Sequence, residues 1–255
     1  MSSSISTREE LLSSARRASG RCWRAVEAQN LISTAKLTDT AAEQRVLEER
    51  IEKSKPKIPS ECRHLNFLLS TPFRYGAPYP RGSRFRKAGH TPGVFYGAEN
   101  PDTAIAELCF SRLVFYSESP ATRWPPEAGE YTAFAVRYAT ERAIDLTHPP
   151  LNSREAAWTR KMRYDECQEL ADLARSFEIN VIKYASVRDP KTQTNIALLT
   201  CRAFADTDPV ERQTWHIILS SHGARALCEM PRVSLDFDRN AFRGDPRIDR
   251  MKWER

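Results

Sequence analysis

Residues 93–110 read GVFYGAENPDTAIAELCF and predict a short strand that turns directly into a helix. The strand is expected at 93–98, where apolar and aromatic residues precede a polar turn. Asn100 suits the N-cap because its side chain can accept a hydrogen bond from a free backbone N–H, and Pro101 suits the first helical position. Apolar residues then recur at a spacing that predicts a core-facing helix side: Ile105, Leu108, Leu113 and Val114.

The rest of the chain mixes strand-like and helix-like segments without a regular alternation. Runs of β-branched and aromatic residues predict further strands at 131–139, 181–186, 195–200, 214–220 and 233–237. One long helix is expected at 153–177, a short strand or helical turn at 65–70, and a loop in the Pro-, Gly- and Arg-rich residues 72–93. Because only two helices of real length accompany about six strands, we predict an α+β domain with a mixed β-sheet core.

Residues 1–57 have a more helical pattern than the rest. Thr7 with Glu10, and Thr40 with Glu43, have the spacing of capping boxes, and each is followed by a charged helical pattern. The first of these patterns continues to about residue 28, as judged from the placing of its apolar residues. The sequence therefore predicts an N-terminal extension made of two helices.

These patterns suggest a helical extension at 1–57, a domain at 58–240 and a polar, loosely held C-terminal tail at 241–255. The charge run at 43–57 is most simply a solvated helix face, with a partner-binding helix as the alternative. A second copy of the chain is a further partner to be considered.

Composition excludes some classes of function. The chain has 255 residues and a net charge of +6, from 39 Lys and Arg against 33 Asp and Glu. Arginine outnumbers lysine, which favours bidentate contacts with phosphate or carboxylate groups. A charge this small, without an aromatic-rich basic stripe, does not predict direct nucleic-acid binding.

The cysteines and the N-terminus indicate a cytoplasmic protein. Six cysteines are present without CxxC spacing or an accompanying histidine cluster, so we expect free thiols rather than a zinc site or disulfides. The N-terminus lacks the apolar region of a secretory signal, and no apolar run is long enough to span a membrane. We therefore expect neither secretion nor membrane insertion.

Three residues before and within the strand–helix unit are candidates for a ligand-binding or catalytic site. Arg84, in a loop after Gly82, is either a surface ion-pair partner or a planar fork that grips phosphate oxygens. Tyr96 is either a half-buried strand residue or a ring that stacks on a ligand and offers its hydroxyl. Glu107 lies among apolar neighbours, so it faces either solvent or a site.

A second group follows the strand expected at 181–186. Ser186 ends this strand, and its commonest role would be to stabilise the following turn. Arg188 and Asn195 are polar residues at strand edges nearby. No GxSxG sequence surrounds Ser186, so a hydrolase nucleophile is not predicted.

Together these segments resemble the RES domain, a family named for its Arg, Glu and Ser residues. The resemblance covers roughly residues 65–237 and is carried by SRFR, by GVFYGAENPDTAIAE and by KYASVRD with NIAL. Ser83-Arg84-Phe85 stands where the family more commonly has Gly-Arg-Trp. Arg84 is the matching cation because it precedes the aromatic residue, with Arg86 as the alternative, and Arg74 matches an earlier family arginine less well.

The resemblance implies a toxin of a bacterial toxin–antitoxin pair that degrades NAD⁺. It implies a fold similar to ADP-ribosyltransferases and cleavage of the nicotinamide–ribose bond, by phosphate or by water. NAD⁺ would be a substrate, inorganic phosphate a co-substrate, and no cofactor would be needed. The expected partner is an antitoxin with a helix-turn-helix domain that blocks the cleft.

Residue roles follow from the same resemblance. Glu107 would stabilise an oxocarbenium-like transition state, and Arg84 with Arg74 would hold the pyrophosphate. Tyr96 would line the nicotinamide side, and Ser186 would hydrogen-bond the nicotinamide or phosphate end.

Two other functions fit the same residues. An ADP-ribosyltransferase that modifies a macromolecule would use nearly the same site with a different acceptor. A binding module without catalysis would act through residues 1–57. A nucleic-acid binder is the weakest alternative, because the charge of +6 predicts only weak, salt-sensitive association.

Overall fold

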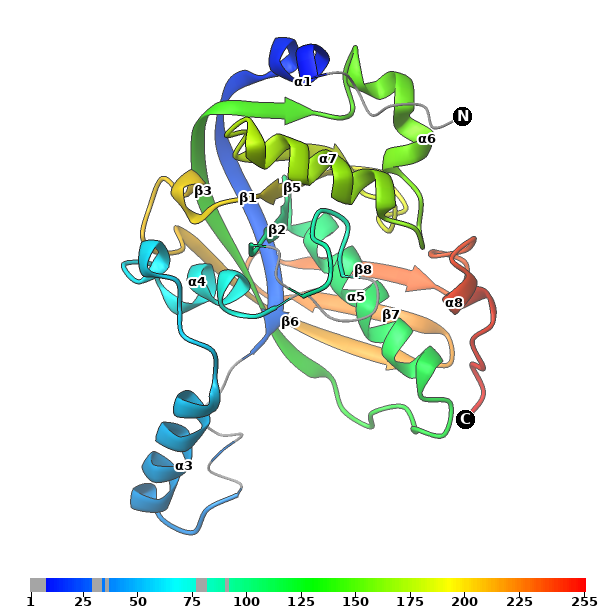
Figure 1. Ribbon diagram of the computed structural model, residues 1–255. Helices are drawn as coiled ribbons and strands as arrows, with labels where there is room; N and C mark the ends of the chain where they lie inside the picture. Colours follow the sequence, from blue (N-terminus) through cyan, green and yellow to red (C-terminus); the bar gives the residue numbers. More distant parts are fainter. Residues whose placement is uncertain (1–7, 29–33, 35–36, 77–81, 90–91) are drawn as a thin grey trace.

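The computed structural model describes residues 8–28, 34, 37–76, 82–89 and 92–255, and it has the predicted α+β class with a mixed sheet at its core (Figure 1). The described residues form eight strands: β1 (Arg16–Glu27), β2 (Phe95–Ala98), β3 (Gly129–Asp145), β4 (Val181–Ala185), β5 (Thr194–Leu198), β6 (Glu211–Ser220), β7 (Gly223–Cys228) and β8 (Val233–Asp238). Each strand predicted from the sequence is present, and β1 and β7 are additional ones.

The strands pair in the order β1-β2-β5-β4-β3-β6-β7-β8, and a further β1–β3 pairing closes the first five into a ring. Strand β3 holds this arrangement together because β1 pairs along one of its edges while β6 and then β4 pair along the other. All pairings are antiparallel except β3–β4. Strands β1 and β2 meet at one residue pair, Trp23 with Ala98, so the ring is weakly joined there.

The strand–helix unit forms as predicted. Helix α5 (Pro101–Glu118) begins at the N-cap Asn100, whose side chain accepts a hydrogen bond from the Thr103 backbone N–H at 2.9 Å. Pro101 occupies the first turn, where its missing N–H leaves no partner unsatisfied. The apolar side of α5, including Ile105 and Leu113, packs in one core cluster with residues of β6, β7 and β8.

The predicted helix over residues 16–28 is wrong, because residues 16–27 form β1. Helix α1 (Arg8–Ser14) does form, although Thr7 of the expected capping box lies outside the described residues. Strand β1 pairs with β3 from Arg16–Ala143 to Glu27–Tyr131. Pairing with a partner more than 100 residues away in sequence overrides local preference here, as is common for strands.

The second N-terminal helix is confirmed. Helix α3 (Ala41–Ser54) starts with a capping box in which Thr40 and Glu43 each bond the other's backbone N–H. It buries none of its residues and extends away from the sheet (Figure 1). Residues 67–74 form α4 (Phe67–Arg74), which settles the choice between strand and helix at 65–70 in favour of helix.

The long helix predicted at 153–177 is interrupted. A 3₁₀ turn (Leu151–Arg154) and the short helix α6 (Glu155–Trp158) precede α7 (Asp165–Ser176). The backbone carbonyls of Trp158 and Arg160 accept hydrogen bonds from Arg84, at 2.5 and 3.1 Å, so they do not continue the helix. This break places residues 159–164 beside the arginine.

The expectation of a loose C-terminal tail is also wrong. Residues 246–249 form α8 (Pro246–Asp249), which contacts α5. Ile248 and Met251 are buried in the same core cluster as the apolar side of α5. Arg255 donates hydrogen bonds to the carbonyls of Tyr116 and Ser119 at the end of that helix. The segment is polar in composition, but it is fixed to the body of the domain.

All six cysteines are free and buried. Among the described residues, no helix is long and apolar enough to cross a lipid bilayer.

Candidate active site

A cavity of about 540 Å³ opens where β1 and β2 diverge. Residues 23–25 of β1 and residues 96–97 of β2, at and next to the single β1–β2 pair, line this cavity. Parts of α5, the loop at 82–84 and the segment at 162–164 also contribute to the lining. Its described lining includes four arginines and one carboxylate, which come from distant parts of the sequence: Arg24, Arg84, Arg188, Arg247 and Glu107. The cavity is therefore strongly cationic with one acidic group.

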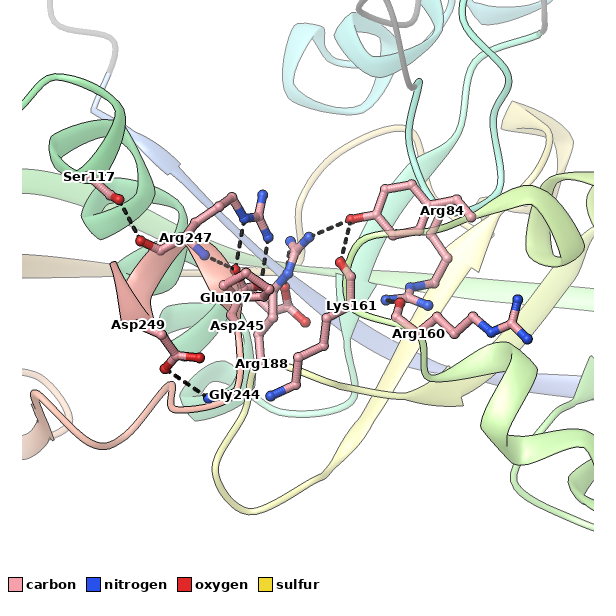
Figure 2. Close-up of polar contacts among 12 residues, drawn as sticks. Arg84, Glu107, Ser117, Arg160, Lys161, Arg188, Gly244, Asp245, Arg247 and Asp249 are labelled. Atoms are coloured by element: carbon pink, nitrogen blue, oxygen red, sulfur yellow. Dashed lines mark hydrogen bonds and ion pairs between the residues drawn. The ribbon is translucent and has the colours of Figure 1, made fainter. Parts of the chain in front are cut away.

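Glu107 faces this cavity, so the solvent-facing alternative is wrong. Its Oε1 atom accepts hydrogen bonds from the Ser186 hydroxyl and from the Asn195 side-chain amide, both at 2.7 Å. Its Oε2 atom lies 3.3 Å from the Arg188 guanidinium. Two neutral donors therefore fix one oxygen. The other oxygen lies beside the Arg188 guanidinium, and both of these side chains are drawn in Figure 2.

Ser186 lies behind Glu107 rather than in the cavity wall. It is completely buried, and its hydroxyl oxygen accepts a hydrogen bond from the Asp189 backbone N–H at 3.0 Å while it donates to Glu107. Asp189 in turn accepts a hydrogen bond from Thr103, near the start of α5. The serine thus joins the turn after β4 to the carboxylate. Because it is fully buried and is not among the described lining residues, its position favours support of Glu107 over the direct hydrogen bond to NAD⁺ that the resemblance implies.

Asn195 was noted in the sequence only as a strand-edge residue, yet it lines the cavity from β5. Its amide nitrogen donates to Glu107, and no described residue donates to its buried Oδ1 atom. Buried acceptors without a partner are rare in folded proteins. Asn195 therefore supports Glu107 through its amide nitrogen, while its Oδ1 atom is a buried acceptor without a partner among the described residues.

Arg188 joins the two sides of the site. Its guanidinium donates to Glu107 and, at 3.0 Å, to the Tyr164 hydroxyl, and it lies 4.7 Å from the centre of the Phe110 ring. Burial is the largest single effect and disfavours its charged form, but the combined influence of Glu107, Tyr164, Tyr184 and Asp245 outweighs burial, and the pKa of Arg188 lies above its ordinary value. Arg188 consequently stays charged in the cavity wall.

Arg84 is buried and lines the cavity. The alternative prediction, that Arg84 is a partner in a surface ion pair, is therefore wrong. Besides its bonds to the carbonyls of Trp158 and Arg160, its guanidinium lies 5.1 Å from the centre of the Tyr164 ring. The loop that carries it turns at Gly82, where φ is +67° and a Cβ atom would lie 2.2 Å from the Arg86 carbonyl oxygen. Only glycine fits this turn.

Tyr96 supports the same loop. Its hydroxyl accepts a hydrogen bond from the Phe85 backbone N–H and bonds the Ser83 hydroxyl, each at 2.9 Å. Burial raises the pKa of Tyr96, against the smaller opposing effect of these hydrogen bonds. The ring lines the cavity, while the hydroxyl holds the segment that presents Arg84.

The other two candidate arginines lie elsewhere. Arg74, at the end of α4, is paired with Glu52 of α3 at 2.7 Å and also donates to the Pro56 carbonyl, and it is not among the cavity residues. Arg86 donates to the Tyr75 carbonyl and is likewise outside the described lining. Of the three arginines weighed from the sequence, the structure brings Arg84 alone to Glu107, Tyr96 and Ser186.

Arg24 is a cavity residue that the sequence analysis missed. It lies on β1, donates to the Tyr96 carbonyl at 3.0 Å and lies 5.2 Å from the centre of the Phe95 ring. No described carboxylate pairs with it, and burial lowers its pKa. The alternation of Cys22, Arg24 and Val26 was a strand signal, but the adjoining capping signals favoured a helix.

Comparison with known proteins agrees with the motifs. A search of curated proteins gives no match to this chain. Among solved structures, a chain of the M. tuberculosis MbcT–MbcA toxin–antitoxin complex is similar, with 11% sequence identity, coverage of 83% of this chain and 91% of that chain, and a TM-score of 0.48. The family model described as the RES domain matches residues 58–220, more than half of the sequence. The chain therefore belongs to the RES domain family.

Proposed function

We propose that this RES-domain protein is an enzyme that degrades NAD⁺ by breaking the bond between nicotinamide and ribose. The observation that carries the proposal is the position of Glu107, the one carboxylate of the described lining, in a cavity that also contains four arginines. NAD⁺ has the complementary charges, with an anionic pyrophosphate and a cationic nicotinamide–ribose centre. The family resemblance supports the same substrate.

Bond cleavage requires little acid catalysis, because nicotinamide is already a cationic leaving group. As the C1′–N bond breaks, its electron pair moves to the nicotinamide nitrogen and positive charge develops on the ribose ring, as in other glycosidic cleavages. The Oε2 atom of Glu107 would face this charge, while Ser186 and Asn195 hold Oε1. A carboxylate fixed in advance stabilises such a charge without reorganising during the reaction.

An acceptor oxygen then forms a new bond to C1′. Phosphate would give an ADP-ribose phosphate ester, whereas water would give ADP-ribose and release one proton. Arg24 and Arg84 would bind the pyrophosphate, because guanidinium groups match phosphate oxygens in both charge and geometry. The rings of Tyr96, Tyr164 and Tyr184 line the cavity and would pack on flat parts of the substrate.

Purified protein incubated with NAD⁺ and followed by ¹H and ³¹P NMR tests this function, with and without inorganic phosphate. Release of free nicotinamide without a macromolecular acceptor supports the proposal, and the phosphorus spectrum identifies the acceptor. Stable NAD⁺ under these conditions, with cleavage only after a protein or nucleic acid is added, would instead indicate an ADP-ribosyltransferase.

In the cell, NAD⁺ loss would inhibit growth, and an antitoxin that covers the cavity would prevent it. Induced expression of the chain should therefore stop growth and lower cellular NAD⁺. An unchanged NAD⁺ level during growth arrest would contradict the link between the cavity and toxicity.

A further inference from the structure

The fourth arginine of the cavity, Arg247, comes from the C-terminal segment beyond the residues that match the family model. This segment is fixed in place, since Ile248 and Met251 are buried in the core cluster that contains the apolar side of α5. The Ser117 hydroxyl of that helix also donates to the Arg247 carbonyl at 2.6 Å. The backbone that carries Arg247 is therefore held against a helix that also carries Glu107.

One edge of the Arg247 guanidinium is also held. Asp245 is 2% exposed and accepts hydrogen bonds from Nε and Nη2 of Arg247, at 2.9 and 2.8 Å. No described residue accepts a hydrogen bond from Nη1, the remaining nitrogen. A bidentate carboxylate on one edge limits the motion of the planar group and leaves the other edge free to donate.

Arg247 also lies close to Arg188. The guanidinium carbon of Arg247 lies 5.1 Å, and that of Arg188 4.7 Å, from the centre of the Phe110 ring, and both residues line the cavity. Figure 2 shows the two arginine side chains next to each other. Like charges that face the same ring repel each other. Arg247 pairs with Asp245 and Arg188 with Glu107, and the negative charge of Asp245 also acts on Arg188. An anion bound between the two guanidinium groups would be attracted by both.

We infer that Arg247 and Arg188 form a phosphate-binding subsite at the end of the cavity beside Glu107, and that the C-terminal segment thereby helps to select the substrate. This inference rests on the proposed function for the source of the phosphate. The group is either part of the dinucleotide or the free phosphate that attacks the ribose. The chemistry of recognition is the same for both, and the experiment separates them.

The test compares the wild-type protein with Arg247→Gln and Arg247→Lys. Calorimetric titration with inorganic pyrophosphate measures anion binding without catalysis. Loss of the charged hydrogen bonds in Arg247→Gln should weaken binding on the order of 10-fold, and the lysine variant should recover part of the loss because it keeps the charge but not the fork. Arg250→Gln is the matched control, since Arg250 is exposed on the same segment and outside the described lining.

Kinetics identify the source of the phosphate. A raised KM for NAD⁺ in Arg247→Gln assigns the subsite to a phosphate of the dinucleotide, and a raised KM for inorganic phosphate assigns it to the acceptor. Arg247→Gln leaves the buried Asp245 carboxylate without its partner, which destabilises the fold. The double variant Asp245→Asn/Arg247→Gln also removes the carboxylate charge, so it is measured alongside the single variant.

Two outcomes would overturn the inference. One is pyrophosphate affinity and both KM values equal to wild type in a folded variant that lacks Arg247. The other is the absence of pyrophosphate binding to the wild-type protein. If the wild-type protein binds pyrophosphate through Arg247 but leaves NAD⁺ intact, the subsite stands and the proposed reaction fails.

Discussion

Ser186 and Glu107, which are 79 positions apart in the sequence, are joined by a hydrogen bond of 2.7 Å, and only the glutamate of the two lines the cavity. We therefore expect the serine to be a positioning residue that acts through the carboxylate. This relationship separates two effects that mutation can measure, the presence of the negative charge and its orientation.

Removing the charge should abolish most of the activity. Glu107→Gln keeps the shape of the side chain but cannot stabilise positive charge on the ribose, so NAD⁺ turnover should fall at least about 100-fold. Thermal unfolding checks that the variant is folded. Glu99→Gln is a suitable control, because Glu99 pairs with Lys183 outside the described lining, and it should retain wild-type turnover. A folded Glu107→Gln protein with full activity would remove Glu107 from the mechanism.

Ser186→Ala should leave the charge but loosen its orientation. Turnover should fall about 10-fold with little change in the KM for NAD⁺, because a positioning contact of about 1–1.5 kcal/mol is lost. The free energy of unfolding should fall by about 1–3 kcal/mol, since the buried Asp189 N–H also loses its acceptor. Ser176→Ala, at the exposed end of α7, provides the control. Wild-type turnover in Ser186→Ala would show that the serine serves the turn alone.

Arg84 and Arg74 should behave differently although both were candidates for pyrophosphate binding. Arg84→Lys loses the planar fork in the cavity wall, and the KM for NAD⁺ should rise about 10-fold. Arg74→Gln loses an ion pair with the exposed Glu52, so its KM should equal that of the wild type. Steady-state kinetics on both variants measure the contrast. A raised KM in Arg74→Gln alone would reverse the assignment of the two residues.

Acid should destabilise the C-terminal segment through Asp245. Burial is the largest single effect and would raise the pKa of this carboxyl, but the hydrogen bonds from Arg247 together with the positive charges of Arg247 and Arg188 outweigh burial and place the pKa below its ordinary value. The unfolded chain therefore takes up a proton at a higher pH than the folded protein does. This contribution to stability is present above the ordinary aspartate pKa of about 3.9 and is lost as the pH falls below it.

Urea unfolding at several pH values checks this effect. The free energy of unfolding of the wild-type protein should fall more steeply below about pH 4 than that of Asp245→Asn, because the variant lacks this titration. The difference between the two pH profiles gives the contribution of Asp245 titration separately from that of the other carboxylates. Parallel pH profiles for the two proteins would contradict the prediction.

Local signals predicted the central part of the fold well. The Asn100 cap, Pro101 and the apolar spacing of α5 are all determined by residues within a few positions of one another, and they place Glu107 correctly. The motif around Ser186 likewise lies at the end of a strand that local residues specify. The side of α5 on which Glu107 lies could not be read from the helix alone, because it depends on Asn195 and Arg188.

The errors in prediction have a common physical cause. Strand β1 forms because β3 lies beside it, and no local pattern shows that pairing. Arg24 was missed for this reason. Arg247 was missed because a polar composition suggested a loose tail, whereas a few buried apolar side chains, Ile248 and Met251 among them, are enough to fix the segment.

The closed ring of strands has a consequence for how the protein is made. Arg24, near the beginning of the chain, and Arg247, near its end, line the same cavity, and β1 cannot pair until β3 has been synthesised. Contacts between such distant residues form late, because the loop entropy must be overcome first. A nascent chain on the ribosome therefore lacks the complete cavity until the residues around Arg247 have been synthesised.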